Sequence, residues 1–500
     1  MPVSDKPVTD DSSPIRIAVI GSGPAGFYAA GHLLKDADAG FEVDMIERLP
    51  TPWGLVRSGV APDHPKIKSV TRVYEKTAAH PRFRYFGNVC FGEHVSREDL
   101  LAHYHAIVYA TGSPMDRPLG IPGEDLPGSH AATEFVGWYN GHPDHTGLEV
   151  DLVSAERAVV IGNGNVAIDV ARMLVLSADE LAPTDTADHA LEVLARSRVR
   201  EVVVVGRRGP AQAAFTNPEL LELGELTDAD VVVDPDELER ALSVHDEAAE
   251  QNATSRRNVE ILRGYAQRTP SEGRKRVVLR FLLSPTELIA GEDGALADVQ
   301  FVRNELAPSD TGALRARATE QSETIPAGLV VRAIGYRGEA LPGVSFDDRA
   351  AVILNEGGRV LDPDSRAPLP GEYVVGWIKR GPSGVIGTNK KDAQETVDAM
   401  LADLTMSANG DGPSESAAGG AGTNATAAAP GPAATHTPSH PDGSAIESLL
   451  RERQPALVTY SGWEAIDRHE RELGERAGRP RVKLTDIEEM LRIAASQTPG

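Results

Sequence analysis

The stretch IRIAVIGSGPAGFYAAGHLLK, residues 15–35, decides the fold of the first part of the chain. An apolar run, Ile15 to Ile20, leads into the glycine turn 21–26, and a second apolar run, Phe41 to Ile46, ends at Glu47. This order predicts strand, turn, helix and strand, and the glycines allow a tight turn and backbone N–H contact with a pyrophosphate. The pattern favours a dinucleotide site, with a purely structural glycine turn as the alternative.

The same pattern recurs further along the chain, with a different residue type at the end of its second strand. An apolar run at 158–161 precedes the turn GNGNVA at 162–167, and the apolar strand 200–205 leads to Arg207-Arg208. An acid at such a strand end accepts hydrogen bonds from a ribose hydroxyl, whereas an arginine pairs with a ribose 2′-phosphate. We therefore expect two different dinucleotides, of which the second carries the NADP phosphate. The polar segment 177–197 lengthens the usual spacing, and a solvated charge pair is the alternative for the two arginines.

Further apolar runs occur at residues 105–111, 330–335 and 373–376. Strands that alternate with helices form parallel sheets covered by helices, so we predict an α/β fold with two Rossmann-like dinucleotide-binding domains, the first discontinuous in sequence.

Residues 407–444 consist mainly of Ala, Gly, Ser, Thr and Pro and predict a disordered linker. Residues 445–500 predict a helical segment that packs on the main body.

Composition narrows the possible functions. A chain of 500 residues, 41% of them hydrophobic, is expected to form two or three domains. Its net charge of -24 argues against nucleic-acid binding, which needs a basic face. Cys90 is the single cysteine, which excludes an internal disulfide and a cysteine-ligated iron–sulfur cluster within the chain. Electrons carried by this protein would therefore pass through organic cofactors.

The sequence contains no stretch as long as a membrane span, and residues 1–13 have neither the basic nor the apolar character of a targeting peptide. We therefore expect a cytoplasmic protein that does not interact with membranes.

Two more segments are rich in glycine, and each contains a tryptophan. They are PWGLVRSGVAPDHP, residues 52–65, and GWIKRGPSGVIGTNK, residues 376–390. Neither shows the periodicity of a helix or a strand. We expect both to be loops whose backbone contacts a flat aromatic ring.

With these two segments, the motifs IGNGNVAIDVAR at 161–172 and GRRGPAQAAFT at 206–216 make a specific combination. The chain resembles the adrenodoxin-reductase-type ferredoxin–NADP⁺ reductases in their bacterial form, over residues 15–404 and again over 448–493. The resemblance implies a glutathione-reductase-like fold. In it, FAD binds a domain made of residues 14–115 and 337–405, and NADP binds a domain made of residues 116–336.

The resemblance also implies a role for individual residues. FAD would be bound by Gly21, Gly23, Ala25, Gly26, Glu47, Leu55, Val95, Trp377, Gly384, Val385 and Ile386. NADP(H) would be bound by Asn163, Gly164, Asn165, Val166, Arg207, Arg208 and Glu219, with Gly384 near the nicotinamide half. His64 and Glu219 are the candidate catalytic acid/base residues, because a histidine titrates near neutrality. An ordinary turn residue is the alternative for His64.

Three functional hypotheses follow. The resemblance implies an enzyme that passes hydride from NADPH to FAD and then single electrons to a ferredoxin, a separate iron–sulfur protein, with the monomer as the working form. The second hypothesis is an NADPH diaphorase that reduces a quinone or oxygen without a ferredoxin partner. The third is a redox-sensing interaction protein that uses the tail from Ser407 onward as a binding arm.

The segment after Glu219 departs from the family. Relatives that bind acidic ferredoxins usually have basic residues there, whereas this chain has LLELGE at 220–225. An acidic ferredoxin would then have to be bound by cations elsewhere, and the candidates are Lys66, Lys68, Arg72, Lys379, Arg380, Lys390 and Lys391.

Overall fold

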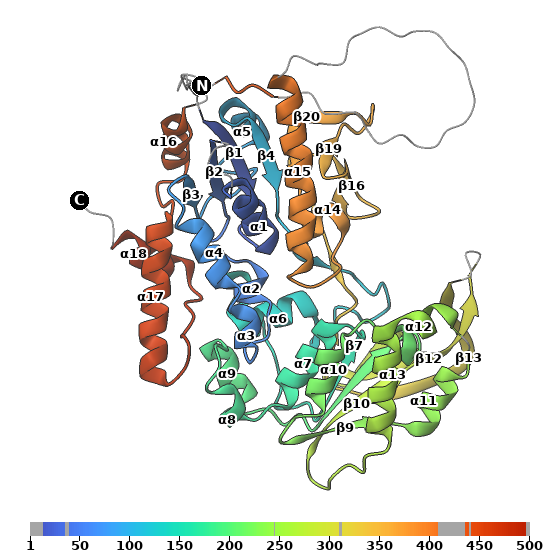
Figure 1. The fold of residues 1–500 in the computed structure, drawn as a ribbon. Helices are drawn as coiled ribbons and strands as arrows, with labels where there is room; N and C mark the ends of the chain where they lie inside the picture. The colour runs from blue at the N-terminus through green and yellow to red at the C-terminus, as the bar shows by residue number, and fades with distance from the viewer. Residues whose placement is uncertain are drawn as a thin grey trace, which may run out of the picture.

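The computed structural model describes residues 14–35, 40–244, 246–309, 313–408, 436–439 and 442–496. The N-terminal pattern forms a seven-stranded sheet in the order β18-β19-β20-β4-β1-β2-β3. Its strands are β1 (Ile15–Ile20), β2 (Phe41–Ile46), β3 (Phe83–Phe86), β4 (Ala106–Tyr109), β18 (Asn355–Glu356), β19 (Arg359–Leu361) and β20 (Pro368–Val374). The strands from β20 to β3 are parallel, which confirms the predicted α/β layer (Figure 1).

Helices cover both faces of this first sheet, because β1 has apolar side chains on each of its two faces. Ile17 and Val19 pack toward α1 (Pro24–Leu33), α4 (Thr71–Ala78) and α15 (Thr388–Ala408). Ala18 and Ile20 pack on the other face, toward α5 (Arg97–His103) and α16 (Gly443–Arg453). The carboxyl ends of the parallel strands are left for the loops that carry the site.

A second sheet, all parallel, has the order β6-β14-β7-β8-β10-β9. Its strands are β6 (Ser129–Ala131), β7 (Arg157–Ile161), β8 (Glu201–Gly206), β9 (Ala229–Val233), β10 (Lys275–Phe281) and β14 (Leu329–Arg332). Helices α6 (Ala132–Asn140), α7 (Asn165–Val175), α10 (Asn217–Leu223) and α13 (Ala253–Ala266) pack on one face. The other face is covered by an antiparallel sheet of β11 (Leu283–Ala290), β12 (Leu296–Pro308) and β13 (Leu314–Pro326), which the sequence did not predict.

Two segments of the chain connect the first sheet to the second, and these two segments pair with each other. β5 (Met115–Asp116) and β15 (Tyr336–Arg337) form an antiparallel pair, so both crossings between the sheets contain a short strand. The polar segment 177–197 forms α8 (Ala178–Leu181) and α9 (Asp188–Leu194).

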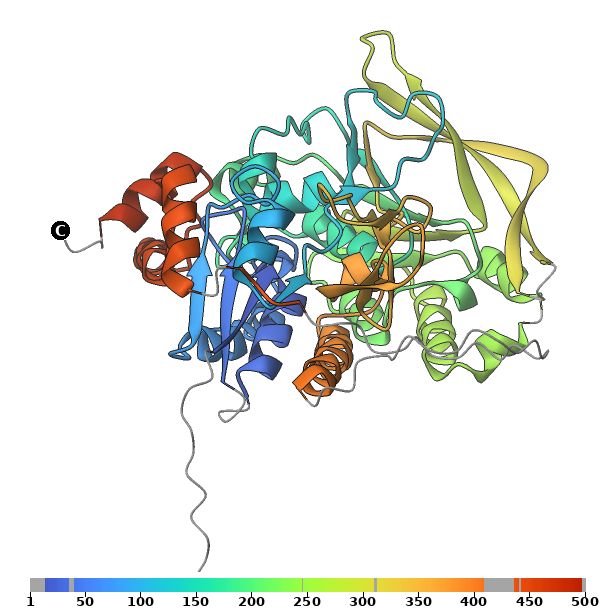
Figure 2. The same ribbon diagram turned by 90° about the horizontal axis from the view of Figure 1, so that it is seen from above.

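The C-terminal segment packs on the first sheet through three helices, α16, α17 (Tyr460–Ala477) and α18 (Ile487–Ala495). Trp463 and Ile466 of α17 are buried in the same apolar cluster as Ile17 and Val19. Figure 2 shows α17 and α18 on one flank of the molecule and the β11–β13 sheet on the opposite flank. The predicted linker 407–444 lies almost entirely outside the described residues, and within the described ones no helix is long and apolar enough to cross a membrane.

Candidate functional site

The first glycine turn leaves open space beside its backbone. Gly21 has φ of +103°, and a Cβ there would lie 2.6 Å from the carbonyl oxygen of Ala110. Gly23, by contrast, has no atom within 4 Å of the position a Cβ would take. The turn is therefore tight against β4 on one side and open on the other, where the first turn of α1 presents its N–H groups.

Glu47 lies directly after β2 and is held beside this turn. Its Oε2 atom accepts hydrogen bonds from the Ser22 N–H at 2.9 Å and the Ser22 hydroxyl at 2.6 Å, and its Oε1 atom accepts one from the Leu49 N–H at 3.1 Å. The carboxylate is thus fixed next to the glycine turn with acceptor capacity remaining on Oε1. This is the position that a ribose hydroxyl requires.

The segments 52–65 and 376–390 both meet the first glycine turn. The Trp53 N–H donates to the Ser22 carbonyl at 3.0 Å, and a Cβ on Gly54 would lie 3.0 Å from the Gly23 Cα. On the other side, Gly376 has φ of +78°, and a Cβ on it would lie 2.6 Å from the Cβ of Ala25. Close approach of three backbone segments requires glycine at these points.

The expectation that both segments are loops is only partly right. The first contains α2 (Leu55–Ser58) and leads into α3 (Pro65–Lys68), and the second contains α14 (Trp377–Arg380) and the start of α15. These helices have one turn or begin at the segment's end, which is why no periodicity is visible in the sequence.

The residues predicted for the flavin differ in their exposure. Leu55 and Val385 are large apolar side chains that are 39% and 55% exposed. The Trp377 indole N–H donates to the Ser383 carbonyl at 3.2 Å, and its ring lies 5.3 Å from that of Tyr336. Val95 is buried in the apolar cluster below the sheet, so only its backbone is placed to meet a ligand.

The second glycine turn, between β7 and α7, lies beside the end of β8. A Cβ on Gly206 would clash with the Asn163 side chain, whose Nδ2 atom is buried and has no hydrogen-bond partner among the described residues. The Asn165 Oδ1 atom accepts from the Thr216 N–H at 2.8 Å, which ties the turn to the segment 206–216. Gly164, like Gly23, faces open space, with its nearest neighbour 4.0 Å away.

Arg207 and Arg208 follow β8 directly and are held by their backbones alone. The Arg207 carbonyl accepts from the Asn304 Nδ2 at 2.9 Å, and the Arg208 carbonyl accepts from the Leu282 N–H at 3.2 Å. Neither guanidinium has an ion-pair or hydrogen-bond partner in the part of the chain that the structure describes. Two unpaired guanidiniums beside a glycine turn are suited to a phosphate.

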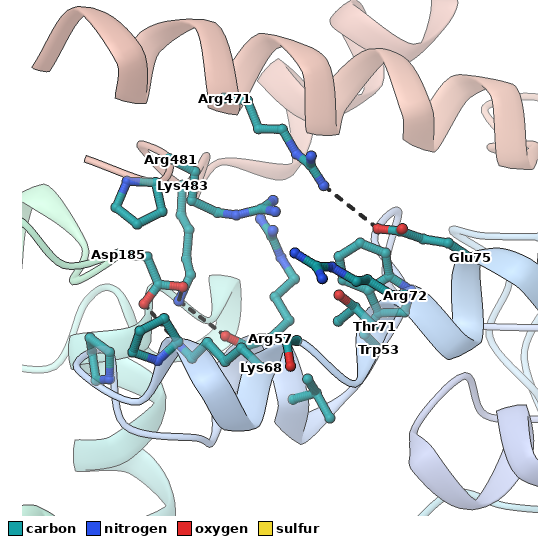
Figure 3. A pocket seen from close by; sticks show the side chains of 15 residues that line it. Trp53, Arg57, Lys68, Thr71, Arg72, Glu75, Asp185, Arg471, Arg481 and Lys483 are labelled. Carbon is teal, nitrogen blue, oxygen red and sulfur yellow. Dashed lines mark hydrogen bonds and ion pairs between the residues drawn. The ribbon is translucent and has the colours of Figure 1, made fainter. Parts of the chain in front are cut away.

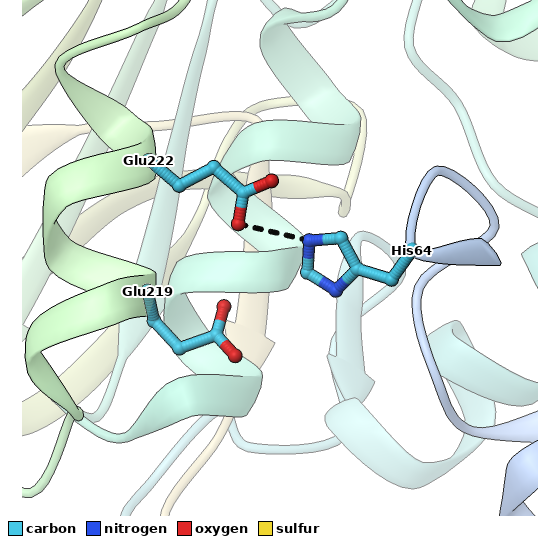
Figure 4. Close-up of side chains that lie close together, drawn as sticks. All are labelled: His64, Glu219 and Glu222. Atoms are coloured by element: carbon cyan, nitrogen blue, oxygen red, sulfur yellow. Dashed lines mark hydrogen bonds and ion pairs between the residues drawn. The ribbon is translucent and has the colours of Figure 1, made fainter. Parts of the chain in front are cut away.

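The structure brings His64 and Glu219 together, although His64 lies in a loop of the first unit and Glu219 lies on a helix of the second. His64 precedes α3 and is 7% exposed, while Glu219 and Glu222 lie on α10 (Figure 4). The His64 Nε2 atom is 3.0 Å from Glu222 Oε2, and the ligand atoms of all three residues lie within 4.8 Å of one another. Glu219 Oε2 is buried without a partner among the described residues.

Arg172, on α7, completes this cluster. Its Nη1 atom is 2.7 Å from His64 Nε2 and 3.3 Å from Asp169 Oδ1, and its Nη2 atom pairs with Asp63. One ring nitrogen cannot both donate to Glu222 and accept from Arg172. Because a protonated imidazole donates from both nitrogens, the bond to Glu222 is the one that forms in that state.

The environment shifts several pKa values in the cluster. Burial lowers the pKa of His64, but the hydrogen bond to Glu222 and the charge of Asp169 outweigh it, and the pKa is raised. Burial raises the pKa of Asp169 to about 7, and the charge of Glu219 adds to this effect. Burial also raises the pKa of Glu219, whereas the bond from His64 lowers the pKa of Glu222. The cluster can therefore hold or release a proton near neutral pH.

Comparison with known proteins identifies the family. Residues 15–208 match the pyridine nucleotide-disulphide oxidoreductase family. The chain is 52% identical to NADPH-ferredoxin reductase FprA of Mycobacterium leprae, covering 96% of this chain and 98% of that one. The chain belongs to this family of NADPH-ferredoxin reductases. The structure of Mycobacterium tuberculosis FprA in complex with NADPH matches it with a TM-score of 0.86 and 49% identity, over 97% of this chain and 100% of that one.

A more distant relative agrees with the predicted resemblance. The mitochondrial NADPH:adrenodoxin oxidoreductase of Arabidopsis thaliana is 37% identical over 97% of this chain and 96% of that one. The reductase is an FAD-dependent and NADP(H)-dependent oxidoreductase, as the two glycine turns predicted. The open turns at Gly23 and Gly164, the fixed Glu47 and the unpaired arginines all fit these two cofactors. Although residues 15–208 match a family that is named for disulphides, the sequence of the reductase has one cysteine, Cys90.

Several of the cations that the sequence offered for docking are not available in the reductase. Lys68 pairs with Asp185 at 2.6 Å, and both Lys379 and Arg380 lie within 3.5 Å of Asp392. Lys391 pairs with Glu395 on the surface of α15. Lys66, Arg72 and Lys390 are exposed, and their side chains have no ion pair among the described residues.

Sequence reasoning did not select Asp63, Asp169 and Arg172 as site residues. Asp169 and Arg172 are separated by three positions on α7, so they lie on one face of that helix, which follows the second glycine turn. Their signal is present in the motif at 161–172, but only the tertiary contact with His64 shows that they belong to the same cluster.

Proposed function

We propose that the reductase takes electrons from NADPH and delivers them to a ferredoxin, with residues 14–115 and 337–405 binding FAD and residues 116–336 binding NADP(H). FAD, when bound, accepts a hydride from a nicotinamide and releases electrons singly, so it joins a two-electron donor to a one-electron acceptor. The observation that carries this proposal is the His64–Glu222 hydrogen bond beside Glu219, because it joins the loop of the first glycine unit to α10 of the second.

The two glycine turns are the proposed binding sites for the two dinucleotides. Glu47 is suited to a ribose without a phosphate, since its carboxylate would repel one, whereas Arg207 and Arg208 favour the 2′-phosphate. Leu55, Trp377 and Val385 are proposed to contact the flavin, because burial of their exposed apolar surface would favour a flat ring. These assignments rest on the geometry of the turns and on family membership.

The cluster around His64 is proposed to position the nicotinamide half of NADP(H) and to hold a proton near it. Hydride transfer depends chiefly on the placement of the reactants, so rigid, buried side chains are of direct use. The cluster has an excess of carboxylates, Asp63, Asp169, Glu219 and Glu222, over the cations Arg172 and His64. This charge would favour the oxidised nicotinamide, which is positive, over the reduced form.

We further propose that a single chain is the working unit, since one chain carries both proposed dinucleotide sites. We also propose that the enzyme is cytoplasmic. The names of the relatives support a ferredoxin as the electron acceptor. Lys66, Arg72 and Lys390 are the cations available to attract an acidic ferredoxin in a chain whose net charge is -24.

The second candidate is an NADPH diaphorase that needs no ferredoxin. It is favoured by one observation, the absence of a basic residue in α10, whose sequence is NPELLEL. Steady-state reduction of cytochrome c by NADPH separates the two. We expect added ferredoxin to accelerate the rate strongly at low ionic strength and less at high ionic strength. If ferredoxin gives no acceleration at any ionic strength, the diaphorase is correct.

A further inference from the structure

A cavity of about 330 Å³ lies between α17 and the helices α2, α3 and α4, and no residue of either glycine turn lines it. Pockets that bind small molecules usually have volumes of about 300–1,000 Å³. Figure 3 shows side chains pointing into the space from three parts of the chain. They come from α2–α4, from α17 with the segment 480–483 that follows it, and from Asp185 of the second unit.

The lining of this cavity is rich in cations. Those in the lining are Arg57, Lys68, Arg72, Arg471, Arg481 and Lys483, whereas the acids in the lining are Glu75 and Asp185. Two more carboxylates, Glu470 and Asp467, pair with the arginines from behind. Six cations therefore meet four carboxylates, an excess of two positive charges in a chain whose net charge is -24.

The lysines at the base of the cavity share one carboxylate. Lys68 Nζ is 2.6 Å from Asp185 Oδ1, and Lys483 Nζ is 3.3 Å from Asp185 Oδ2. Burial lowers the pKa of Lys483 well below its usual range, and the charges of Lys68 and Arg57 add to the effect against the opposing charge of Asp185. Burial thus disfavours the charged form of Lys483, and an anion in the cavity would favour that form.

Two donors at the cavity have no partner among the described residues. Arg72 lies on the exposed rim and makes no ion pair or hydrogen bond. The Trp53 indole N–H belongs to a side chain that is 3% exposed, and it too is without an acceptor. An incoming anion would provide the acceptors that this part of the lining does not supply.

We propose that this cavity binds a small phosphate-bearing anion with at least two negative charges. Deep placement of Lys483, Arg57 and Asp185, each less than a tenth exposed, favours a small molecule over the side chains of a protein partner. Bound there, the anion would link α17 and the segment 480–483 to the loop 52–65, which carries His64. This inference does not depend on ferredoxin being the electron acceptor.

The test is a calorimetric titration of inorganic pyrophosphate into the FAD-loaded enzyme saturated with NADP⁺, so that the second dinucleotide site is already filled. We expect saturable binding at one site and a rise in Tm with pyrophosphate concentration. Arg72→Glu should weaken this binding at least about tenfold, since one charged contact is lost and a like charge is added. Lys76→Glu is the matched control, because Lys76 is exposed on the same helix but does not line the cavity, and it should bind as the wild type does.

Parallel titrations with orthophosphate and with AMP distinguish the possible sources of the anion. Tighter binding of AMP would assign the cavity to a phosphate monoester, and tighter binding of orthophosphate to an inorganic anion. The proposal is overturned if pyrophosphate gives no saturable heat, if Arg72→Glu binds it unchanged, or if Arg207→Ala abolishes the signal. It is also overturned if Arg72→Glu slows the ferredoxin-dependent rate while pyrophosphate binding stays as in the wild type, because the cavity rim would then belong only to a protein-docking surface.

Discussion

Replacement of Arg207 or Arg208 by alanine tests the assignment of the second dinucleotide most directly. Both residues follow β8 beside the second glycine turn, and neither guanidinium pairs with a carboxylate in the described part of the chain. Their backbones, not their side chains, make the contacts that hold this segment. Truncation should therefore leave the fold intact and affect the ligand alone.

The size of the effect follows from the number of charged contacts. A hydrogen bond to a charged group contributes about 1.5–3 kcal/mol, so loss of one arginine should lower kcat/KM for NADPH about 10- to 150-fold. NADH has no 2′-phosphate, so its kcat/KM should be nearly unchanged. If both guanidiniums hold the same phosphate, the double variant should lose less than the product of the single effects, because residues that share a partner are not additive.

The assay is steady-state reduction of a dye such as ferricyanide with each nucleotide at constant ionic strength. Arg196→Ala is the control, since Arg196 is an exposed arginine of the second unit that pairs, among the described residues, with Glu192 at 3.9 Å. Equal losses with NADPH and NADH would refute the phosphate role, and so would a loss with NADPH no greater than that of the control.

Three further predictions concern cofactor retention, pH dependence and stability. Gly376→Val should lower the FAD content of purified enzyme, because a side chain at φ of +78° is strained and would overlap Ala25, as absorbance per chain would show. Glu222→Gln removes the carboxylate that raises the pKa of His64, so a kinetic limb that requires protonated His64 should move to lower pH. Burial opposes ionisation of Asp185, but Lys483 and Lys68 lower its pKa from 3.8 to about 2. Asp185→Asn should therefore cost about 2 kcal/mol in denaturant unfolding at pH 7, and the loss should shrink as the pH falls from about 4 toward 2.

Each of these predictions has a matched control. Gly264→Ala should retain FAD, because Gly264 lies on α13, outside the segments assigned to FAD, and no atom lies within 4 Å of the position of the new Cβ. Glu225→Gln changes an exposed acid just beyond α10 and should leave the pH profile in place. Asp188→Asn alters a mostly exposed carboxylate near Asp185 and should cost less stability. A variant that behaves like its control contradicts the corresponding assignment.

The two glycine units could be predicted from sequence because their signals are local. Strands β1 and β2 have the predicted bounds, and Glu47 and Arg207 lie at strand ends where the apolar runs stop. Helix α1 (Pro24–Leu33) lies between β1 and β2, as the order strand, turn, helix and strand predicted. The alternation of strand and helix then determines the parallel sheets, whatever the rest of the chain does.

The sequence did not predict individual elements whose apolar residues are sparse or interrupted. Strand β13 has the sequence LRARATEQSETIP, and nearly all of it is exposed or half-buried, so it shows no buried face in sequence. The buried side of α17 includes Glu470 and Gly474 beside Trp463 and Ile466, so its apolar stripe is interrupted. Glu470 is buried because it pairs with Arg57 and Arg481, which a sequence pattern cannot reveal.

The site was predictable in its parts but not in its assembly. His64 and Arg172 are 108 positions apart, and only the tertiary fold, which places the residue before α3 beside α7, brings them to 2.7 Å. For the same reason, the sequence could not show which of the candidate docking cations are paired. Lys68 and Lys379 are paired because Asp185 and Asp392 lie beside them in the fold.

The polar segment 177–197 explains why the second glycine unit has unusual spacing. In sequence it only lengthens the distance from the turn to Arg207, yet in the structure it supplies Asp185 to Lys68 and Lys483. It also supplies Asp188 to Arg479, which follows α17. The shift in the pKa of Asp185 corresponds to about 2 kcal/mol, so its contact with Lys483 can hold the second unit against the C-terminal segment. The insertion therefore provides the charges that connect the proposed NADP-binding unit to the first sheet's C-terminal helices, next to the loop that positions His64.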